Sequence, residues 1–312
     1  MNKCLLFLGV ATAMTSILNA QQSGWPPSAD HLTLPVWPGV APGAAANLPP
    51  EADTTTAKDN LVAGKPVVRI GNVSTPTLTL FAPRGKNTGA AVVVFPGGGY
   101  HILAIDLEGT EVCDWLNTIG VNCVLLKYRV PNAENEHGSQ AALQDSQRAL
   151  GLVRQHAAEW HIDPNRIGVL GFSAGGHLAA NISTHFDQRI YPPVDAADKL
   201  SCRPDFAVLI YPAYLALEKQ NFAPNPDIQP TANTPPTFIV QTEDDPVHVE
   251  NALVYYQELK NAKVPAELHI YAQGGHGYGL RRTALPVTTW PESLETWLHT
   301  INVIPGKAMP AK

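Results

Sequence analysis

Short, fully apolar segments recur along the chain from residue 90 onward, and longer segments with a helical pattern separate them. Strands that are apolar throughout are typical of a parallel sheet with both faces covered. Their alternation with helices predicts an α/β fold in which a mostly parallel sheet is sandwiched between helices. The predicted strands are 90–95, 121–128, 166–170, 205–210, 236–242 and 266–271. The predicted helices are about 108–119, 139–158, 174–184, 247–261 and 291–302.

The chain before residue 90 follows a different pattern. Strand signals at 67–70 and 77–81 are consistent with an antiparallel start to the sheet. From Trp25 to Pro66 the chain is rich in Pro, Gly and Ala without sustained periodicity, which predicts extended chain on the surface. A second irregular segment, 211–236, is rich in Pro and Asn, and we interpret it as a rim over the functional site. The predicted organisation is an extension at 21–66, one main α/β domain at 67–303 without a large cap, and a tail at 304–312.

The first twenty residues combine a positive charge with a short apolar run. Lys3 precedes apolar residues 5–18, and the run closes with Ala20 before two glutamines. This order is typical of an export signal that is cleaved after residue 20, and the run is too short for a membrane anchor. We therefore expect a secreted or periplasmic protein without stable membrane insertion.

Composition and charge narrow the function classes. The 312 residues are 45% hydrophobic, which is enough for a chain of this length to bury about 75% of its unfolded surface. The net charge is −6, and no stretch concentrates Lys and Arg, which argues against nucleic acid or an anionic membrane as a partner. No His and acidic residues show ligand spacing for a metal. Neither a metal nor an organic cofactor is expected, and the sequence leaves the oligomeric state open.

A serine between two glycines lies at the junction of a predicted strand and a predicted helix. Gly171 and Gly175 allow a sharp turn without side-chain clashes, so that the hydroxyl of Ser173 stands exposed above the sheet edge. The start of the helix also directs free backbone N–H groups toward any negative charge that forms there. Ser173 is therefore the candidate nucleophile, and His177, one turn later, is interpreted as packing beside it.

The strand predicted at 90–95 ends in three consecutive glycines. An oxyanion hole needs uncovered amides about 2.7–3.1 Å from the developing charge, and side chains there would block the approach. We predict donors at Gly98 and Gly99, together with Ala174, which follows the candidate nucleophile. Esterases commonly begin this loop with His, whereas this chain has Pro96, so which two loop amides donate stays open.

Two later strands end in residues that could complete a catalytic triad. Three acids follow the strand predicted at 236–242. We select Asp245 because Pro246 marks the first turn of a helix, which would place this carboxylate near the N-cap and keep it ionised, while Asp244 is the alternative. His276 lies among glycines after the last strand, where its ring can swing to a serine, and it is the candidate base.

These motifs resemble those of the α/β-hydrolase superfamily, in which nucleophile, acid and base occur in the order seen here. Within that superfamily the chain resembles secreted bacterial esterases related to acetylxylan and feruloyl esterases. The resemblance is carried by residues 34–43, 96–100, 107–109, 127–129, 171–177 and 275–279. It implies an α/β-hydrolase fold and a serine carboxylesterase, with Ser173, Asp245 and His276 as the triad, that hydrolyses acyl esters, acetyl above all, of a carbohydrate such as xylan.

Five residues are candidates for the substrate rim, and each is equally well explained by packing: Tyr100, His101, Glu108, Tyr211 and Tyr214. Two other functions stay open. A serine peptidase of the prolyl-oligopeptidase type shares the fold and the order, but such enzymes usually carry a propeller domain for which this chain has no room. A non-catalytic carbohydrate-binding protein on a hydrolase scaffold is the other, and the full set of reactive residues argues against it.

Three cysteines follow the predicted signal, and an odd number permits at most one bridge. Cys113 on a predicted helix and Cys123 on the next strand could form it. We favour free buried thiols instead, because they are common in protein cores.

Overall fold

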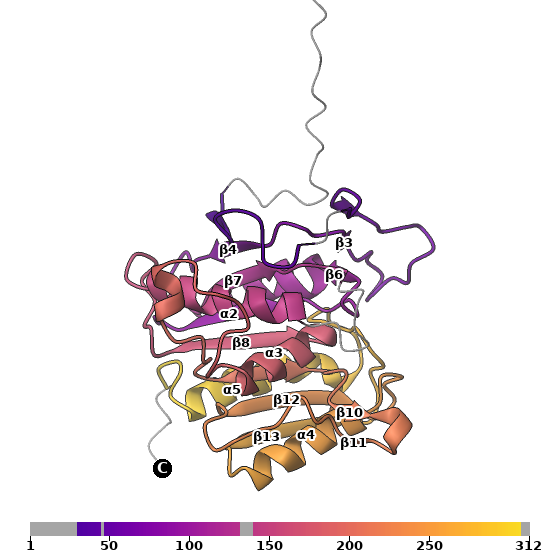
Figure 1. Ribbon diagram of the computed structural model, residues 1–312. Helices are drawn as coiled ribbons and strands as arrows, with labels where there is room; N and C mark the ends of the chain where they lie inside the picture. The colour runs from indigo at the N-terminus through magenta and orange to yellow at the C-terminus, as the bar shows by residue number, and fades with distance from the viewer. Residues whose placement is uncertain (1–29, 45–46, 132–139, 307–312) are drawn as a thin grey trace, which may run out of the picture.

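The computed structural model describes residues 30–44, 47–131 and 140–306 (Figure 1). Its centre is an eight-stranded sheet in the order β1-β4-β7-β5-β8-β9-β12-β13. The bounds are β1 Thr33–Pro35, β4 Thr77–Phe81, β7 Asn122–Lys127, β5 Ala91–Phe95, β8 Ile167–Phe172, β9 Ala207–Ile210, β12 Thr237–Thr242 and β13 Ala266–Tyr271. All pairings from β7 to β13 are parallel, and β1 and β4 add antiparallel pairings at one edge. The mostly parallel sheet that the sequence predicts is confirmed.

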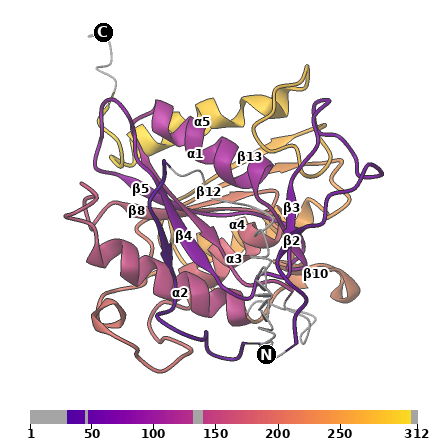
Figure 2. The same cartoon turned by 90° about the horizontal axis from the view of Figure 1, so that it is seen from above.

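Helices cover both faces of this sheet. Figure 2 shows α1 and α5 on one face and α2, α3 and α4 on the other. Their bounds are α1 Glu111–Thr118, α2 Gln140–Gln155, α3 Ala174–Thr184, α4 Glu250–Asn261 and α5 Trp290–Thr300. Among the described residues, no helix is both long enough and apolar enough to cross a bilayer.

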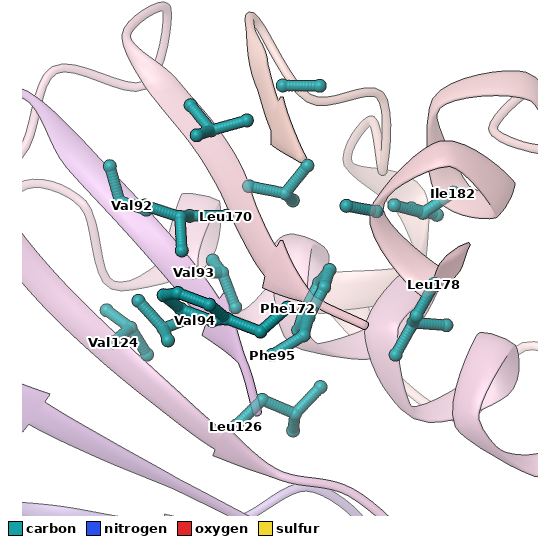
Figure 3. Packing of buried hydrophobic residues seen from close by; sticks show 14 of the residues in the cluster. Val92, Val93, Val94, Phe95, Val124, Leu126, Leu170, Phe172, Leu178 and Ile182 are labelled. Atoms are coloured by element: carbon teal, nitrogen blue, oxygen red, sulfur yellow. The ribbon is translucent and has the colours of Figure 1, made fainter. Parts of the chain in front are cut away.

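The central strands form the most deeply buried part of the core. Every residue of β5 and β8 is buried, as their uninterrupted apolar sequence predicts. Leu178 and Ile182, four residues apart on α3, belong to the same hydrophobic cluster as Val94 and Phe172 of these strands (Figure 3). Each such side chain contributes about 1.5–3 kcal/mol when it is buried. The carboxyl ends of β5 and β8, where the glycine loop and Ser173 begin, are therefore held by a rigid core.

Element bounds agree closely with the sequence prediction, with two informative differences. The helix expected from residue 247 begins at Glu250, because the Asp245 side chain accepts a hydrogen bond from the Val247 amide and forms a local turn first. The strand expected at 67–70 corresponds to β3 (Arg69–Gly71), which does not join the central sheet. It pairs with β2 (Ala52–Asp53) and β6 (Ile102–Ala104) in a separate three-stranded sheet.

Part of the expected surface extension is buried. Residues 33–35 form β1, which pairs with β4, and the Val36 and Trp37 side chains that follow are 0% and 5% exposed. The Trp37 indole donates a 2.7 Å hydrogen bond to Asp145 on α2. The expectation of surface chain is wrong here because this partner is more than 100 residues away in sequence. The predicted signal at 1–20 lies outside the described residues.

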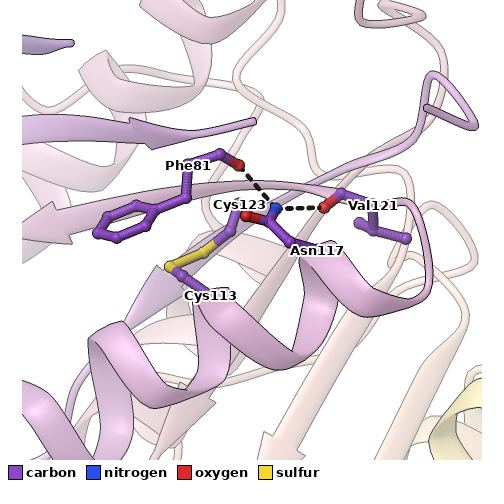
Figure 4. The surroundings of a disulfide bond; sticks show 5 residues. All are labelled: Phe81, Cys113, Asn117, Val121 and Cys123. Atoms are coloured by element: carbon purple, nitrogen blue, oxygen red, sulfur yellow. Dashed lines mark hydrogen bonds between the residues drawn. A yellow bond between two sulfur atoms is a disulfide. The ribbon is translucent and has the colours of Figure 1, made fainter. Parts of the chain in front are cut away.

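A disulfide joins Cys113 of α1 to Cys123 of β7, with the two Cα atoms 5.1 Å apart (Figure 4). The expectation of free thiols is therefore wrong for this pair, while Cys202 is free and buried. Beside the bridge, Asn117 donates hydrogen bonds to the Phe81 and Val121 carbonyls. The bridge exists because the turn after α1 folds the helix back along β7, and the spacing of the cysteines alone does not reveal this.

The segment 211–236 forms a small hairpin at the carboxyl edge of the sheet. Its strands are β10 (Ala216–Leu217) and β11 (Ala223–Pro224), with a 3-10 turn at Glu218–Gln220 between them. The hairpin packs against α4 (Figure 1).

Candidate active site

The turn between β8 and α3 holds Ser173 in a strained conformation. Its φ of 52° and ψ of −117° lie in a region that residues with a side chain rarely adopt. A Cβ atom at Gly171 would overlap the Gly175 carbonyl, and one at Gly175 would overlap the Phe95 carbonyl. Both glycines are therefore required by close packing of backbone on backbone.

Ser173, His276 and Asp245 form a continuous chain of hydrogen bonds. Ser173 Oγ lies 2.8 Å from His276 Nε2, and His276 Nδ1 lies 2.8 Å from Asp245 Oδ2. The carboxylate assigns the imidazole proton to Nδ1, which leaves Nε2 to accept the serine hydroxyl proton. The Asp245 side chain is fully buried, and its other oxygen accepts the Val247 amide at 2.7 Å. The structure thus brings together three residues that are up to 103 positions apart.

Asp244 points to a different group. Its carboxylate accepts hydrogen bonds from the amides of Gly275 at 2.8 Å and Gly274 at 3.2 Å. These amides, Gly275 first, lower the pKa of Asp244. Asp244 therefore holds the loop that carries His276, while Asp245 contacts the imidazole itself.

The glycine loop after β5 leaves two amides available. Gly98 and Gly99 have φ values of 133° and 63°, and a Cβ at Gly98 would overlap the Ile102 carbonyl. Within the described part of the chain, neither of these amides has a protein acceptor, whereas the Gly97 amide donates to Glu108. Ala174 is the first residue of α3, so its N–H precedes the intrahelical bonds. The three amides selected from the sequence therefore have no backbone acceptor among the described residues.

Glu108 is a buried carboxylate between the two functional loops. It is 4% exposed; Oε2 accepts the Gly97 amide at 2.7 Å, and Oε1 accepts the Tyr211 hydroxyl at 2.8 Å. The Tyr211 hydroxyl in turn accepts the Gly279 amide, and its ring lies 4.9 Å from the His276 ring. Burial raises the pKa of Glu108, against the opposing effect of the Tyr211 hydroxyl. Glu108 therefore ties the glycine loop to the histidine loop.

The predicted substrate rim divides into two groups. Tyr100, Glu108 and Tyr211 are 4%, 4% and 0% exposed, so the structure places them beneath the surface rather than at a rim. Tyr100 bonds His177 through its hydroxyl at 2.8 Å. Tyr214, which is 39% exposed, and His101, which is exposed, do lie at the surface beside the glycine loop. The sequence could not separate these groups, because aromatic and acidic residues in loops occur both in cores and at rims.

The described residues contain no candidate metal site. In residues 30–44, 47–131 and 140–306, no three His, Cys, Asp or Glu side chains are grouped so that they could hold a metal ion.

Comparisons with known proteins agree with this architecture. Residues 92–229 match a protein family with an alpha/beta hydrolase fold. The crystal structure of an acetyl ester-xyloside bifunctional hydrolase from Caldicellulosiruptor lactoaceticus is 34% identical, with a TM-score of 0.67 over 88% of this chain and 97% of that chain. The chain belongs to the alpha/beta hydrolase family.

Two curated relatives of this alpha/beta hydrolase bear names from xylan degradation. An acetylxylan esterase of Xylanibacter ruminicola is 32% identical over 72% of this chain and 48% of the relative. Endo-1,4-beta-xylanase B of Butyrivibrio fibrisolvens is 30% identical over 60% of this chain and 32% of the relative. The chain thus spans about half the length of the first relative and a third of the second. The resemblance inferred from the sequence motifs is confirmed.

Proposed function

We propose that this alpha/beta hydrolase is a secreted serine carboxylesterase that removes acyl groups, acetyl above all, from carbohydrate esters such as acetylated xylan. The observation that carries the proposal is the hydrogen-bonded chain from Ser173 through His276 to Asp245. The substrate class is supported by the names of the relatives and of the bifunctional hydrolase. The backbone N–H groups of the glycine loop beside the serine are suited to bind an ester carbonyl.

The proposed reaction begins when His276 Nε2 takes the proton of Ser173 and Oγ attacks the ester carbonyl. Asp245 stabilises the imidazolium that results. The tetrahedral oxyanion is received by the amides of Gly98, Gly99 and Ala174. Collapse returns the proton from His276 to the departing alcohol and leaves the acyl group on the serine. Water, deprotonated by the same imidazole, then releases the acid and restores the serine.

The oxyanion amides supply part of the rate enhancement because they are held in place before the charge forms. Loss of one such donor costs about 10²–10³ in turnover in serine hydrolases. The buried Glu108 contributes indirectly, because it fixes the Gly97 amide and the Tyr211 hydroxyl that support the two loops.

Export is also part of the proposal. The Cys113–Cys123 disulfide supports it, because such bonds persist in oxidising compartments and are rare in the reducing cytosol.

The decisive experiment compares wild type with Ser173→Ala. We expect wild type to react with a fluorophosphonate probe, to hydrolyse p-nitrophenyl acetate, and to release acetate from acetylated xylan, as measured by mass spectrometry. Ser173→Ala should lose all three activities with an unchanged unfolding temperature. Cleavage of dipeptide anilides without ester hydrolysis would instead identify a peptidase. Equal acetate release by both proteins would disprove the proposal.

A further inference from the structure

A cleft of about 550 Å³ lies beside the candidate active site. The hairpin formed by β10 and β11 lines one wall, and the loop that follows Asp245 lines the other. We call it the hairpin cleft; the lining residues used below are Tyr214, Glu218, Phe222, Val247 and His248. Its volume lies within the usual range for small-molecule sites and is far larger than an acetyl group requires.

The hairpin cleft shares both of its walls with the reaction centre. The Ala213 amide donates to the Ser173 carbonyl, and Tyr214 follows directly, with its ring stacked 6.3 Å from Tyr100 of the glycine loop. On the opposite wall, the Val247 amide donates to Asp245. A molecule bound in the cleft would therefore contact the same loops that position the proposed nucleophile and acid.

The two walls are fixed relative to each other by one buried side chain. Asn251 Oδ1 accepts the Leu215 and Ala216 amides at 2.8 and 3.0 Å. Its Nδ2 donates to the Val247 and His248 carbonyls at 2.6 and 3.1 Å. Every hydrogen-bonding position of this amide is thus used to join the hairpin to the acid loop. The cleft is formed before any ligand arrives, which lowers the entropic cost of binding.

Local strain is concentrated on the lining. Tyr214, Phe222 and His248 have φ values of 58°, 57° and 74°. Residues with side chains adopt this region only when the surrounding structure imposes it, and such positions cluster at ligand sites. Here the strain directs two aromatic rings and an imidazole to one cavity.

The chemistry of the lining fits a neutral ring with one apolar face and several hydroxyls. The exposed Tyr214 and the half-buried Phe222 supply aromatic surface to the cleft, and the Phe222 ring lies 5.2 Å from the His248 ring. Glu218 and His248, 3.6 Å apart, supply an acceptor and a donor at the edge. A pyranose presents C–H groups on its faces and hydroxyls around its rim, and this pattern matches an aromatic platform bordered by polar groups.

We propose that the hairpin cleft binds the sugar rings of the alcohol side of the ester, namely xylosyl units next to the acylated one. The identity of the sugar rests on the proposed function, whereas the location rests on the cavity and its contacts. The small acyl group then needs only the space at the glycine loop.

The test measures binding and catalysis separately. In the full chain carrying Ser173→Ala, titration calorimetry with unacetylated xylotriose should give saturable binding. Adding Phe222→Ala should weaken that binding at least tenfold. In the active enzyme, Phe222→Ala should lower kcat/KM for acetylated xylotriose at least tenfold more than kcat/KM for p-nitrophenyl acetate. Phe186 is a partly buried phenylalanine outside the cleft, and Phe186→Ala is the matched control. It should leave unchanged both the affinity for xylotriose and the ratio of kcat/KM between acetylated xylotriose and p-nitrophenyl acetate.

Phe222→Leu keeps most of the volume without the aromatic face, and it replaces Phe222→Ala if the smaller side chain prevents folding. Equal xylotriose affinity with and without the Phe222 substitution would overturn the inference. Ester hydrolysis by wild type without any xylotriose binding would also overturn it, while leaving the proposed function intact. If the protein binds xylotriose in a way that depends on Phe222 but hydrolyses no ester, the inference about the hairpin cleft stands and the proposed esterase function fails.

Discussion

Two regions of this hydrolase bury carboxylates in opposite ways. Behind the sheet, Asp145 of α2 is fully buried against the guanidinium of Arg129, with Arg129 Nη2 2.9 Å from Asp145 Oδ1. At the carboxyl edge, Asp245 and Glu108 are equally enclosed, but within the described chain neither contacts a lysine or an arginine. The first region pairs permanent charges, whereas the second uses amides, a phenol and an imidazole.

The ion pair serves to hold distant segments together. Asp145 also accepts the Trp37 indole, and Arg129 donates to the Pro42 carbonyl, so the pair fixes the N-terminal segment against α2. The proposed reaction does not require either group to change its protonation state, and Arg129 supplies the buried carboxylate with a cation.

The carboxyl edge has a different requirement, because the proposed reaction moves a proton there. A guanidinium beside Asp245 would neutralise the charge that the proposed mechanism needs when His276 becomes an imidazolium. Neutral donors hold the carboxylate in position without cancelling its field. The comparison therefore separates a structural use of buried charge from the proposed catalytic one.

The largest expected effect comes from removing the charge of the proposed acid. Asp245→Asn should lower kcat for p-nitrophenyl acetate by about 10⁴-fold, because an amide no longer selects the correct imidazole tautomer. Asp244→Asn is the matched comparison and should lower kcat far less, since Asp244 contacts the amides of the histidine loop and not the imidazole itself. Steady-state kinetics decide between them, and equal losses would contradict the assignment.

Removing one partner of the structural pair should affect stability instead. We expect Asp145→Asn to lower the free energy of unfolding by about 3–5 kcal/mol, because Arg129 is left buried without its anion. The exposed pair of Arg282 and Glu292 provides the control, and Glu292→Gln should cost less than about 1 kcal/mol. Urea unfolding measures both. The folded fraction of Asp145→Asn should keep the kcat of wild type, and a large loss of kcat would break the comparison.

Substitution of Glu108 is expected to lower both kcat and the free energy of unfolding, each by less than the two variants above. Glu108→Gln places an amide against two donors, so we expect a loss of about 1–3 kcal/mol in unfolding free energy. Displacement of the two loops should lower kcat by about tenfold to a hundredfold. An unchanged kcat would show that Glu108 does not position either loop.

The same variant gives a pH dependence with a defined sign. Because burial raises the pKa of Glu108, the folded protein holds the proton at a pH where the unfolded chain has lost it. Ionisation of Glu108 therefore lowers the unfolding free energy of wild type as pH rises from the pKa of this group in the unfolded chain to its higher pKa in the folded protein. Glu108→Gln lacks this ionisation. Urea unfolding from about pH 4 to pH 8 should show that the difference in unfolding free energy between wild type and Glu108→Gln becomes smaller as pH rises.

Most of the sheet could be predicted because its signals are local. The uninterrupted apolar sequences of β5 and β8 identify them as buried strands, and the bounds of β4, β13 and α3 agree with the prediction to the residue. Ser173 belongs to the same class, since its glycines act within four residues of it. By contrast, β3 has the sequence of a sheet strand but pairs in a different sheet, because strand pairing depends on long-range partners.

The candidate site shows where local signals end. Among three consecutive acids, only the fold shows that Asp245 reaches the imidazole while Asp244 binds its loop. The sequence singled out Glu108 only as a candidate for the substrate rim, because its two partners come from different loops, one of them 103 residues away. The disulfide likewise depends on how α1 returns along β7.

The sequence by itself determined the α/β class, the order of the elements, the family and the types of residue available for chemistry, because periodicity and turn glycines act over a few residues. Only the tertiary structure decided which acid meets the histidine, which carboxylate is buried behind the loops, and where a cleft opens. Those outcomes depend on contacts between segments tens to hundreds of residues apart, and such contacts are set by the packing of the whole chain.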